Sequence, residues 1–242
     1  TDDGSALAPT LTAALIKHGW ETAVLRFAGT SVFSTKKRKS FPKQTALIEL
    51  SSSEETELQS SLKDLEEKHG NIGGLINLNP ASAASGSLNL QEGANAFLRH
   101  AFITVKNTAA SLKQASNSGS RRSLFVSVCR MDGQLGMGSG EYGAVVSGLS
   151  GLVKTASVEW PEVFCRFVDL HPKLPADEAA NCILQELHDP NSNIKEVGYF
   201  PSNKSAVNRV TVSPKKVRDL ATSDAGSSVT PESVFLVSGG AR

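Results

Sequence analysis

The sequence predicts an α/β protein built on a doubly wound, mostly parallel sheet, and three observations point to it. Short runs rich in Val, Ile, Leu and Phe alternate with segments whose apolar residues recur every three or four positions. This alternation is typical of parallel strands joined by crossover helices. The run at residues 124–128 is apolar almost throughout, as expected of a central strand covered on both faces. An extended segment at 209–212 follows the last such unit and predicts an antiparallel edge strand.

The elements alternate regularly along the chain. Strands are predicted over residues 22–27, 46–50, 74–78, 124–128, 164–169 and 196–200. Helices are predicted over residues 7–15, 52–69, 94–112, 142–156 and 180–187. Ser52 and Glu55 have the spacing of a capping box and are expected to open the second helix. The order is that of a doubly wound sheet of the Rossmann type.

Composition divides the chain into three parts. Residues 1–212 carry all the alternating elements and form the predicted folded domain. Residues 213–230 are rich in Ser, Lys, Asp and Gly without apolar periodicity, which is typical of a linker. Residues 231–242 have the pattern of a buried strand that runs into a glycine turn. We therefore expect the last segment to be the opening of a second unit of the same type.

Overall composition excludes several classes of function. The 242 residues carry a net charge of +1 and a mean hydropathy of −0.16, so charge alone favours neither nucleic acid nor an anionic membrane as a partner. No apolar run approaches the roughly 18 residues needed to cross a bilayer. The three cysteines are far apart and the five histidines are scattered, so no metal site is predicted. Isolated free thiols are expected in a reducing compartment, which predicts a cytoplasmic protein.

The turn before the first helix is a poor dinucleotide site. Such a site needs a glycine-rich turn whose backbone N–H groups approach the pyrophosphate. Residues 1–8 offer one glycine, Gly4, and place Asp2 and Asp3 where phosphate would lie. Carboxylates would repel the cofactor. The turn is therefore predicted to be degenerate, with no cofactor bound.

No catalytic residue is predicted. A Ser/Tyr/Lys reductase site needs a lysine four residues after the tyrosine, yet Val146 follows Tyr142, and Cys129 stands where serine is expected. Without a cation beside it, a tyrosine keeps a pKa of about 10, too high for acid catalysis at neutral pH. Lys154 lies three turns away along the helix. A hydrolase triad of Ser127, His171 and Asp169 lacks the Gly-x-Ser-x-Gly elbow and has the wrong chain order.

Two polar clusters remain open to more than one interpretation. Lys36, Lys37, Arg38 and Lys39 form either a solvated loop or a docking patch for an acidic partner. Asn77 and Asn79, at the end of a strand, fit the asparagine-rich turn of short-chain reductases and equally a simple turn preference.

Residues 147–170, SGLSGLVKTASVEWPEVFCRFVDL, carry a resemblance that covers nearly the whole chain. They are similar to the structural subdomain of ketoreductases in modular polyketide synthases, and the WPEVFCR segment resembles the polyunsaturated fatty acid synthases. ELHDPN at 186–191, EVGY at 196–199 and VSGGAR at 237–242 fit the same family.

The resemblance implies a division of labour between two Rossmann-like halves. The first half has lost its cofactor turn, and the second binds NADPH and reduces a 3-oxoacyl group carried on the phosphopantetheine of an acyl carrier domain. Ser238, Gly239, Gly240 and Arg242 match the opening of the second half's nucleotide loop, which would bind cofactor only in the intact domain. A basic residue such as Arg242 can pair with the 2′-phosphate of NADPH.

On this interpretation the chain is a non-catalytic support for the catalytic half in the same polypeptide. Two alternatives stay open: an NADPH-dependent 3-oxoacyl reductase active in its own right, or a docking module for acyl carrier domains.

Overall fold

The computed structural model describes residues 1–28, 39–52, 54–81, 88–118, 122–138, 147–202, 206–212 and 232–234. At positions 80, 81 and 88–94 only the backbone is described. The chain divides into two compact units, Thr1–Val212 and Ser213–Arg242. The first unit holds every helix and strand given below. The predicted linker and most of the predicted last strand lie outside the described residues.

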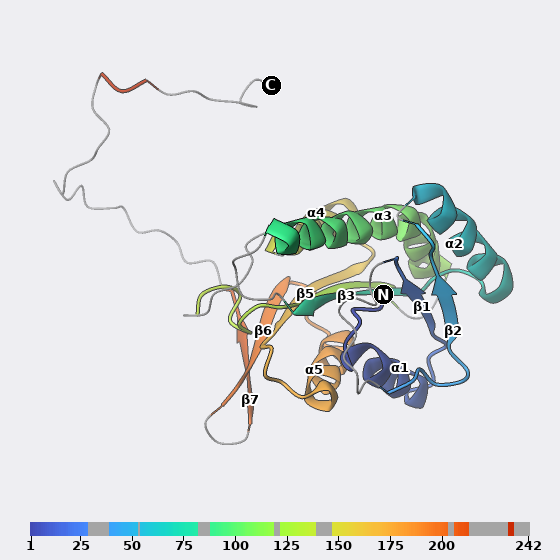
Figure 1. Ribbon diagram of the computed structural model, residues 1–242, viewed down its shortest axis with the longest axis horizontal. Helices are drawn as coiled ribbons and strands as arrows, with labels where there is room; N and C mark the ends of the chain where they lie inside the picture. The colour runs from blue at the N-terminus through green and yellow to red at the C-terminus, as the bar shows by residue number, and fades with distance from the viewer. Residues whose placement is uncertain are drawn as a thin grey trace. The chain divides into compact units, whose positions relative to one another are not determined.

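Helices and strands follow the predicted order (Figure 1). The strands are β1 (Ala23–Arg26), β2 (Ala46–Glu49), β3 (Gly74–Ala81), β4 (Leu124–Arg130), β5 (Phe164–Leu170), β6 (Glu196–Pro201) and β7 (Val207–Thr211). The helices are α1 (Leu7–Lys17), α2 (Glu55–His69), α3 (Leu88–Ser118), α4 (Gly148–Glu159) and α5 (Ala176–His188).

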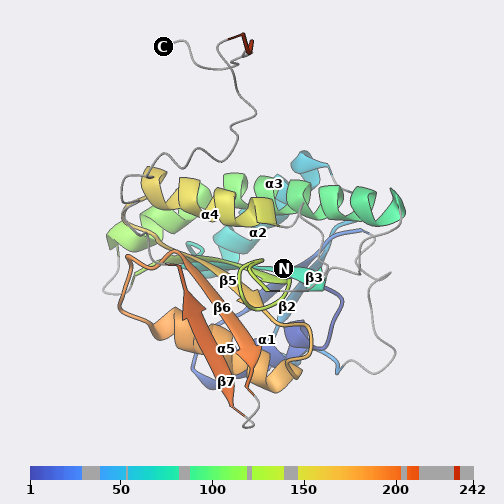
Figure 2. The same ribbon diagram turned by 90° about the vertical axis from the view of Figure 1, so that its left-hand side faces the viewer.

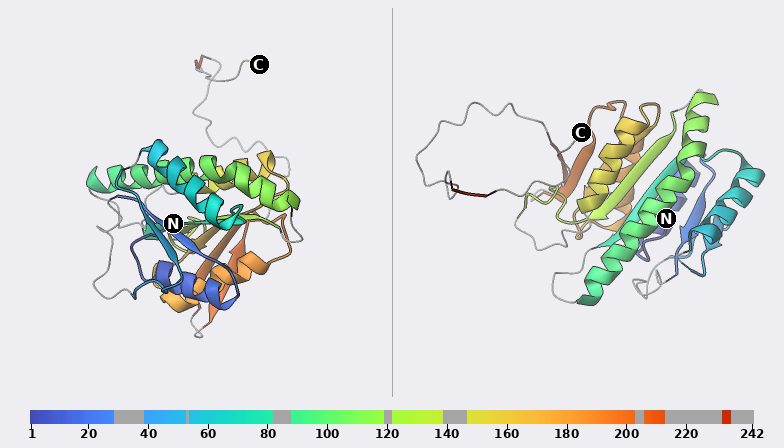
Figure 3. Two further views of the ribbon diagram at one scale, coloured as in Figure 1. Left: turned by 90° about the vertical axis from the view of Figure 1, so that its right-hand side faces the viewer. Right: turned by 90° about the horizontal axis from the view of Figure 1, so that it is seen from above.

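The main sheet has five strands in the order β3-β4-β5-β6-β7. The first four are parallel, and β7 pairs antiparallel with β6, so the predicted edge strand is confirmed. Strands β1 and β2 form a separate parallel pair beside β3 (Figure 3). The α/β class and the mostly parallel sheet agree with the sequence analysis.

Helices cover both faces of the sheet, which is why its central strands are buried almost throughout. Helices α1 and α5 lie on one face and α2, α3 and α4 on the other (Figure 2). Every residue of β5 is buried, as is all of β4 except its last residue. A parallel strand buried on both faces cannot alternate apolar and polar side chains.

The start of α2 corrects one prediction. The helix begins at Glu55 with Glu54 as its N-cap residue, and Ser52 bonds to Glu57 and not to Glu55. The Glu57 carboxylate accepts four hydrogen bonds, from the backbone N–H and hydroxyl groups of Ser51 and Ser52, at 2.7 to 3.0 Å. These bonds lower the pKa of Glu57 to about 2. Glu55 instead pairs with Lys106 at 2.9 Å.

A buried ionic cluster ties the end of α5 to strands β5, β6 and β7. The side chains of Arg166 and Glu186 are almost fully buried and hydrogen-bonded to each other. Glu186 also accepts hydrogen bonds from Tyr199 and from Arg209, the latter at 2.6 and 3.1 Å. Asp189 pairs with both arginines, at 3.2 and 2.9 Å. These ion pairs compensate the charges of Arg166 and Glu186, which the fold buries.

Candidate functional site

The carboxyl ends of the parallel strands are where open α/β sheets bind ligands. Here that edge is formed by the ends of β1, β3, β4 and β5, by the turn at residues 1–6 before α1, and by the loop at 131–138 after β4. The candidate site is therefore this edge, and its chemistry depends on what the turn and the loop present.

The turn before α1 is closed by its own side chains. Asp2 accepts a hydrogen bond from the backbone N–H of Gly4 at 2.9 Å. Asp3 accepts one from the N–H of Ser5 at 3.0 Å and one from its hydroxyl at 2.6 Å. The Ser5 hydroxyl oxygen in turn accepts from the N–H of Leu7, the first residue of α1, at 3.0 Å. Backbone donors that point at an anion in a nucleotide site are here bound to the chain's own oxygens.

Gly4 is the one glycine of this turn, and its φ of 75° lies in the left-handed region. Glycine adopts this conformation without the steric cost that a side chain brings. The backbone path of a tight turn thus persists although the other glycines of a nucleotide loop are missing.

A buried ion pair lies where the cofactor would be recognised. Asp2, whose side chain is fully buried, pairs with Arg26 at 2.9 Å, and Arg26 also contacts Glu49. In a dinucleotide fold an arginine near the end of the adjacent strand can receive the 2′-phosphate of NADP. Arg26 lies at such a strand end and is already engaged by two carboxylates. The sequence analysis did not single out Arg26, although its place at the end of a short apolar strand was a signal for it.

The pKa of the neighbouring Asp3 is raised, mainly because the side chain is buried, while the bonds from Ser5 and the charge of Arg130 oppose that rise. Arg130 itself donates to the carbonyls of Pro172 and Leu174 at 3.0 and 2.9 Å. The two cations near the turn, Arg26 and Arg130, therefore both have partners within the chain.

These residues do not fit a dinucleotide. A pyrophosphate at the start of α1 would have to displace the Asp2 and Asp3 carboxylates from the N–H groups and separate Asp2 from Arg26. Carboxylates displaced in this way would stay close to the added phosphates and repel them. The N–H groups of Gly4 and Ser5 are therefore open to a phosphate only if these bonds break.

The ends of β3 and β4 are joined by hydrogen bonds between buried polar side chains. Asn77 donates to the Ser127 hydroxyl at 3.4 Å and accepts from the hydroxyl of Thr1 at 3.2 Å. Asn79 donates to the carbonyl of Val128 at 2.9 Å. The two asparagines thus bond to the neighbouring strand β4, and Asn77 also bonds to Thr1.

Cys129 stands at the position where a reductase serine was sought, and it is fully buried. Its thiol donates to the Asp169 carboxylate at a sulfur–oxygen distance of 3.6 Å. Burial raises the pKa of Cys129 well above its ordinary value, and the charge of Asp169 adds to that rise. A thiol with such a pKa is not a nucleophile at neutral pH.

Asp169 and Asp132 hold the loop at 131–138 in place. Asp169 accepts from the N–H groups of Met131 and Leu135 at 2.8 and 3.0 Å, and burial raises its pKa to about 6. Asp132 accepts from three N–H groups further along the loop, those of residues 134, 136 and 138. Sequence reasoning considered Asp169 only as part of a hydrolase triad and missed this role, since the N–H groups that it binds lie 38 and 34 residues away in the chain.

The other candidate residues are not brought together. The hydrogen bonds of Ser127 and Asp169 go to the partners given above, while His171 accepts from the N–H of Lys173 at 3.1 Å. Lys154 pairs with Glu196 at 3.2 Å. Outside the described residues lie the following sequence candidates: Lys36, Lys37, Arg38, Tyr142, Val146, Ser238, Gly239, Gly240 and Arg242. Lys39 is described and exposed.

The residues that the structure describes hold neither a metal cluster nor a membrane-spanning helix. Nowhere among them do three or more His, Cys, Asp or Glu side chains gather as a metal site would require. Within the same residues, every helix is too short or too polar to cross a membrane.

Comparison of sequences gives a relative among the fatty acid synthases. The chain matches no family model. It is 27% identical over 191 residues to a polyunsaturated fatty acid synthase polypeptide of Thraustochytrium sp. (strain ATCC 26185 / S-3). The match covers 76% of this chain but only 6% of that protein's length.

Comparison with solved structures finds similar folds among dehydrogenases. An alcohol dehydrogenase from Thermococcus sibiricus, complexed with 5-hydroxy-NADP, matches with a TM-score of 0.53 at 16% identity, over 77% of this chain and 88% of that one. A short chain dehydrogenase from Bacillus anthracis str. 'Ames Ancestor' matches with a TM-score of 0.58 at 16% identity, over 80% and 89% of the two chains. The chain thus has a Rossmann-like fold similar to that of short-chain dehydrogenases.

Proposed function

We propose that this chain is the structural, non-catalytic half of a ketoreductase domain in a polyunsaturated fatty acid or polyketide synthase. It supports a second half that binds NADPH and reduces 3-oxoacyl groups carried on the phosphopantetheine of acyl carrier domains, in the cytoplasm. The catalytic half of the same polypeptide and the acyl carrier domains are its partners.

One observation carries this proposal: the nucleotide turn is closed by Asp2 and Asp3 within a fold similar to that of short-chain dehydrogenases. A reductase fold whose phosphate donors are occupied by its own carboxylates keeps the scaffold and loses the cofactor. The similarity to a polyunsaturated fatty acid synthase supports the assignment to such a synthase. In this proposal Ser238, Gly239, Gly240 and Arg242 open the cofactor loop of the catalytic half.

Calorimetry with NADPH tests the proposal directly. The chain of residues 1–242 is compared with a longer chain that continues through the catalytic half. We expect binding by the longer chain alone. Micromolar binding by residues 1–242 would instead favour a reductase active in its own right.

Two matched variants of the longer chain separate the two turns. Gly240→Asp places a carboxylate in the proposed cofactor loop and should weaken NADPH binding by at least ~10-fold, because that carboxylate repels phosphate. Asp3→Asn alters the closed turn and should leave NADPH affinity unchanged. If Asp3→Asn weakened NADPH binding tenfold and Gly240→Asp had no effect on it, the proposal would have placed the cofactor in the wrong half.

The supporting role has its own test. The catalytic half expressed without residues 1–230 should be insoluble or inactive towards a small free ketone. Full activity of that half alone would contradict the scaffold.

A further inference from the structure

The ends of helices α1 and α5 bring two histidines together. The two helices pack against each other on one face of the sheet (Figure 1). His18 is the C-cap residue of α1, and His188 is the last residue of α5. Their imidazole rings lie 5.6 Å apart, centroid to centroid, and are tilted by 46°. Both residues are exposed, so an ion in solution can reach them.

The ring of His188 is held by a backbone carbonyl. Its Nδ1 lies 2.8 Å from the carbonyl oxygen of Leu184. A carbonyl oxygen only accepts hydrogen bonds, so in the neutral imidazole Nδ1 carries the proton and Nε2 carries the lone pair. Histidines that bind a metal ion through Nε2 are commonly oriented by such a bond from the other ring nitrogen. His188 is thus held in the tautomer that a metal ion binds.

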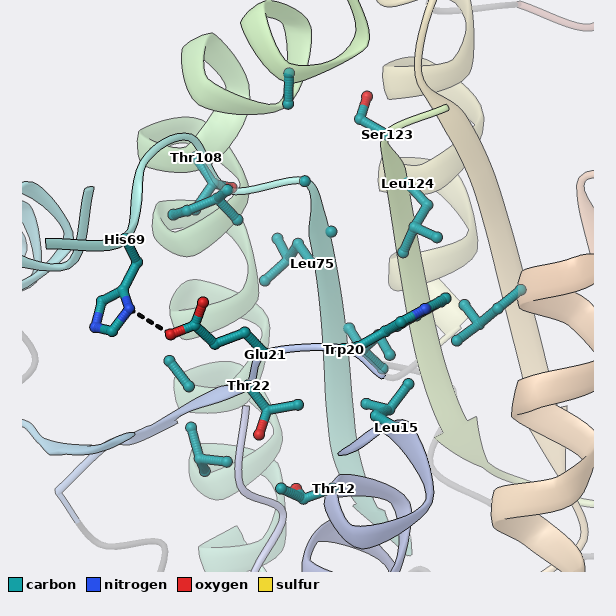
Figure 4. A pocket seen from close by; sticks show the side chains of 18 of the residues that line it. Thr12, Leu15, Trp20, Glu21, Thr22, His69, Leu75, Thr108, Ser123 and Leu124 are labelled. Carbon is teal, nitrogen blue, oxygen red and sulfur yellow. Dashed lines mark hydrogen bonds and ion pairs between the residues drawn. The ribbon is translucent and has the colours of Figure 1, made fainter. Parts of the chain in front are cut away.

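The turn after α1 fixes the position of His18. The N–H of His18 donates to the carbonyl of Leu15 at 3.0 Å. Gly19 follows with a φ of 82°, the left-handed conformation with which many helices end. Trp20 then packs against the core, where Figure 4 shows its indole beside Leu15, and its ring lies 6.0 Å from that of His188. The same short turn therefore holds both His18 and Trp20 close to His188.

The electrostatics of the two helix ends favour a cation, with two opposing charges. The last carbonyls of a helix carry a partial negative charge, and α1 and α5 both end here. Arg122 donates to the carbonyls of Leu187 and Asp189, the former at 2.9 Å, and Lys17 is exposed in the last turn of α1. Because these two cations oppose a divalent ion, its affinity would depend on bonds to the imidazoles.

We propose that His18 and His188 form a binding site for a divalent transition-metal ion that takes imidazole ligands, with Zn²⁺ as the ion that fits the geometry. In a tetrahedral site with Zn–N distances of about 2.0–2.1 Å, two imidazole centroids lie roughly 5 Å apart, close to the observed 5.6 Å. Water molecules would occupy the remaining positions.

Two protein ligands make this site different from a structural zinc site, which has four. Among the described residues no group of three or more His, Cys, Asp or Glu side chains could hold a metal ion. The ion would therefore exchange with solution, and while bound it would join the end of α1 to the end of α5. Sequence could not show the pair, because the two histidines lie near opposite ends of the folded unit and meet only when α1 packs on α5.

Calorimetric titration of the full chain with ZnCl₂ tests the proposal. The wild type should bind Zn²⁺ at this site, and His18→Gln and His188→Gln should each weaken that binding by at least ~10-fold, because each leaves a single imidazole. His171→Gln is the matched control, since His171 follows β5 and belongs to neither helix. It should leave the affinity unchanged. In the wild type, the imidazole nitrogen resonances of His18 and His188 should shift together during an NMR titration.

Thermal unfolding separates loss of the ion from damage to the fold. Without Zn²⁺ the three variants should unfold at the wild-type temperature, because both helix-end histidines are exposed. With Zn²⁺ at ~100 times its Kd, the Tm of the wild type should rise and that of the variant lacking both histidines should not. Equal zinc affinity in the wild type and that double variant, or a loss caused by only one of the single substitutions, would overturn the proposal. Neither measurement involves NADPH or a ketone, so the proposed function is tested separately.

Discussion

Substitution of Glu186 tests how the buried ionic cluster stabilises the fold. Glu186→Gln keeps the shape of the side chain but removes the charge that faces Arg166 and Arg209. Arg166 is fully buried, so its guanidinium would keep only Asp189, at 3.2 Å, as an anionic partner. Breaking a buried pair costs about 3–5 kcal/mol, and the remaining carboxylate places this variant near 3 kcal/mol, the lower end.

The assay is thermal and urea unfolding followed by circular dichroism. A folded unit of this size loses about 2–4 °C in Tm per kcal/mol, so we expect a fall of roughly 6–12 °C. Glu178→Gln is the control, because Glu178 lies exposed in the first turn of the same helix and its charge there is worth less than about 1 kcal/mol.

A double variant separates the ionic contribution from simple damage to the core. Arg166→Met with Glu186→Gln removes both members of the pair and should recover part of the lost stability, because no buried charge is then left unpaired. A single Glu186→Gln variant as stable as Glu178→Gln would refute the reasoning, as would a double variant that is less stable than Glu186→Gln alone.

Two further predictions follow from single sites. Gly198→Ala should lower the free energy of unfolding by at least about 2 kcal/mol, because the alanine Cβ would lie 2.3 Å from the carbonyl oxygen of Gly133. The variant should then unfold at a lower urea concentration than wild type, and equal urea midpoints would contradict this. Cys129 should react with a thiol reagent at pH 7.5 only as fast as the protein unfolds, and rapid labelling of the native protein would show that its thiol is accessible.

Local sequence pattern was sufficient for the fold because each element here obeys its own periodicity. The apolar run at 124–128 predicted a central strand, and β4 is central and buried. The extended segment at 209–212 predicted the antiparallel edge, and β7 pairs with β6 as expected. Helix starts were less predictable, since Ser52 bonds to Glu57 where spacing favoured Glu55.

The site was predictable only where its contacts are local. Asp2 and Asp3 predicted a turn unsuited to phosphate, and their carboxylates do bind N–H groups two residues further along the chain. The carboxylate of Asp169, by contrast, meets the Cys129 thiol and the N–H of Met131, and that meeting requires the register between β4 and β5. No periodicity within either strand encodes that register.

The closed turn lies beside the carboxyl end of β1. Asp2 bonds to the N–H of Gly4 and pairs with Arg26 there, so the charges that would meet a phosphate are already paired within the chain. Asp3 accepts from the N–H of Ser5 beside them. A phosphate could reach these N–H groups only by breaking the bonds to both carboxylates, and the displaced carboxylates would repel it. The closure of the turn therefore depends on side chains of the turn itself and of the end of β1.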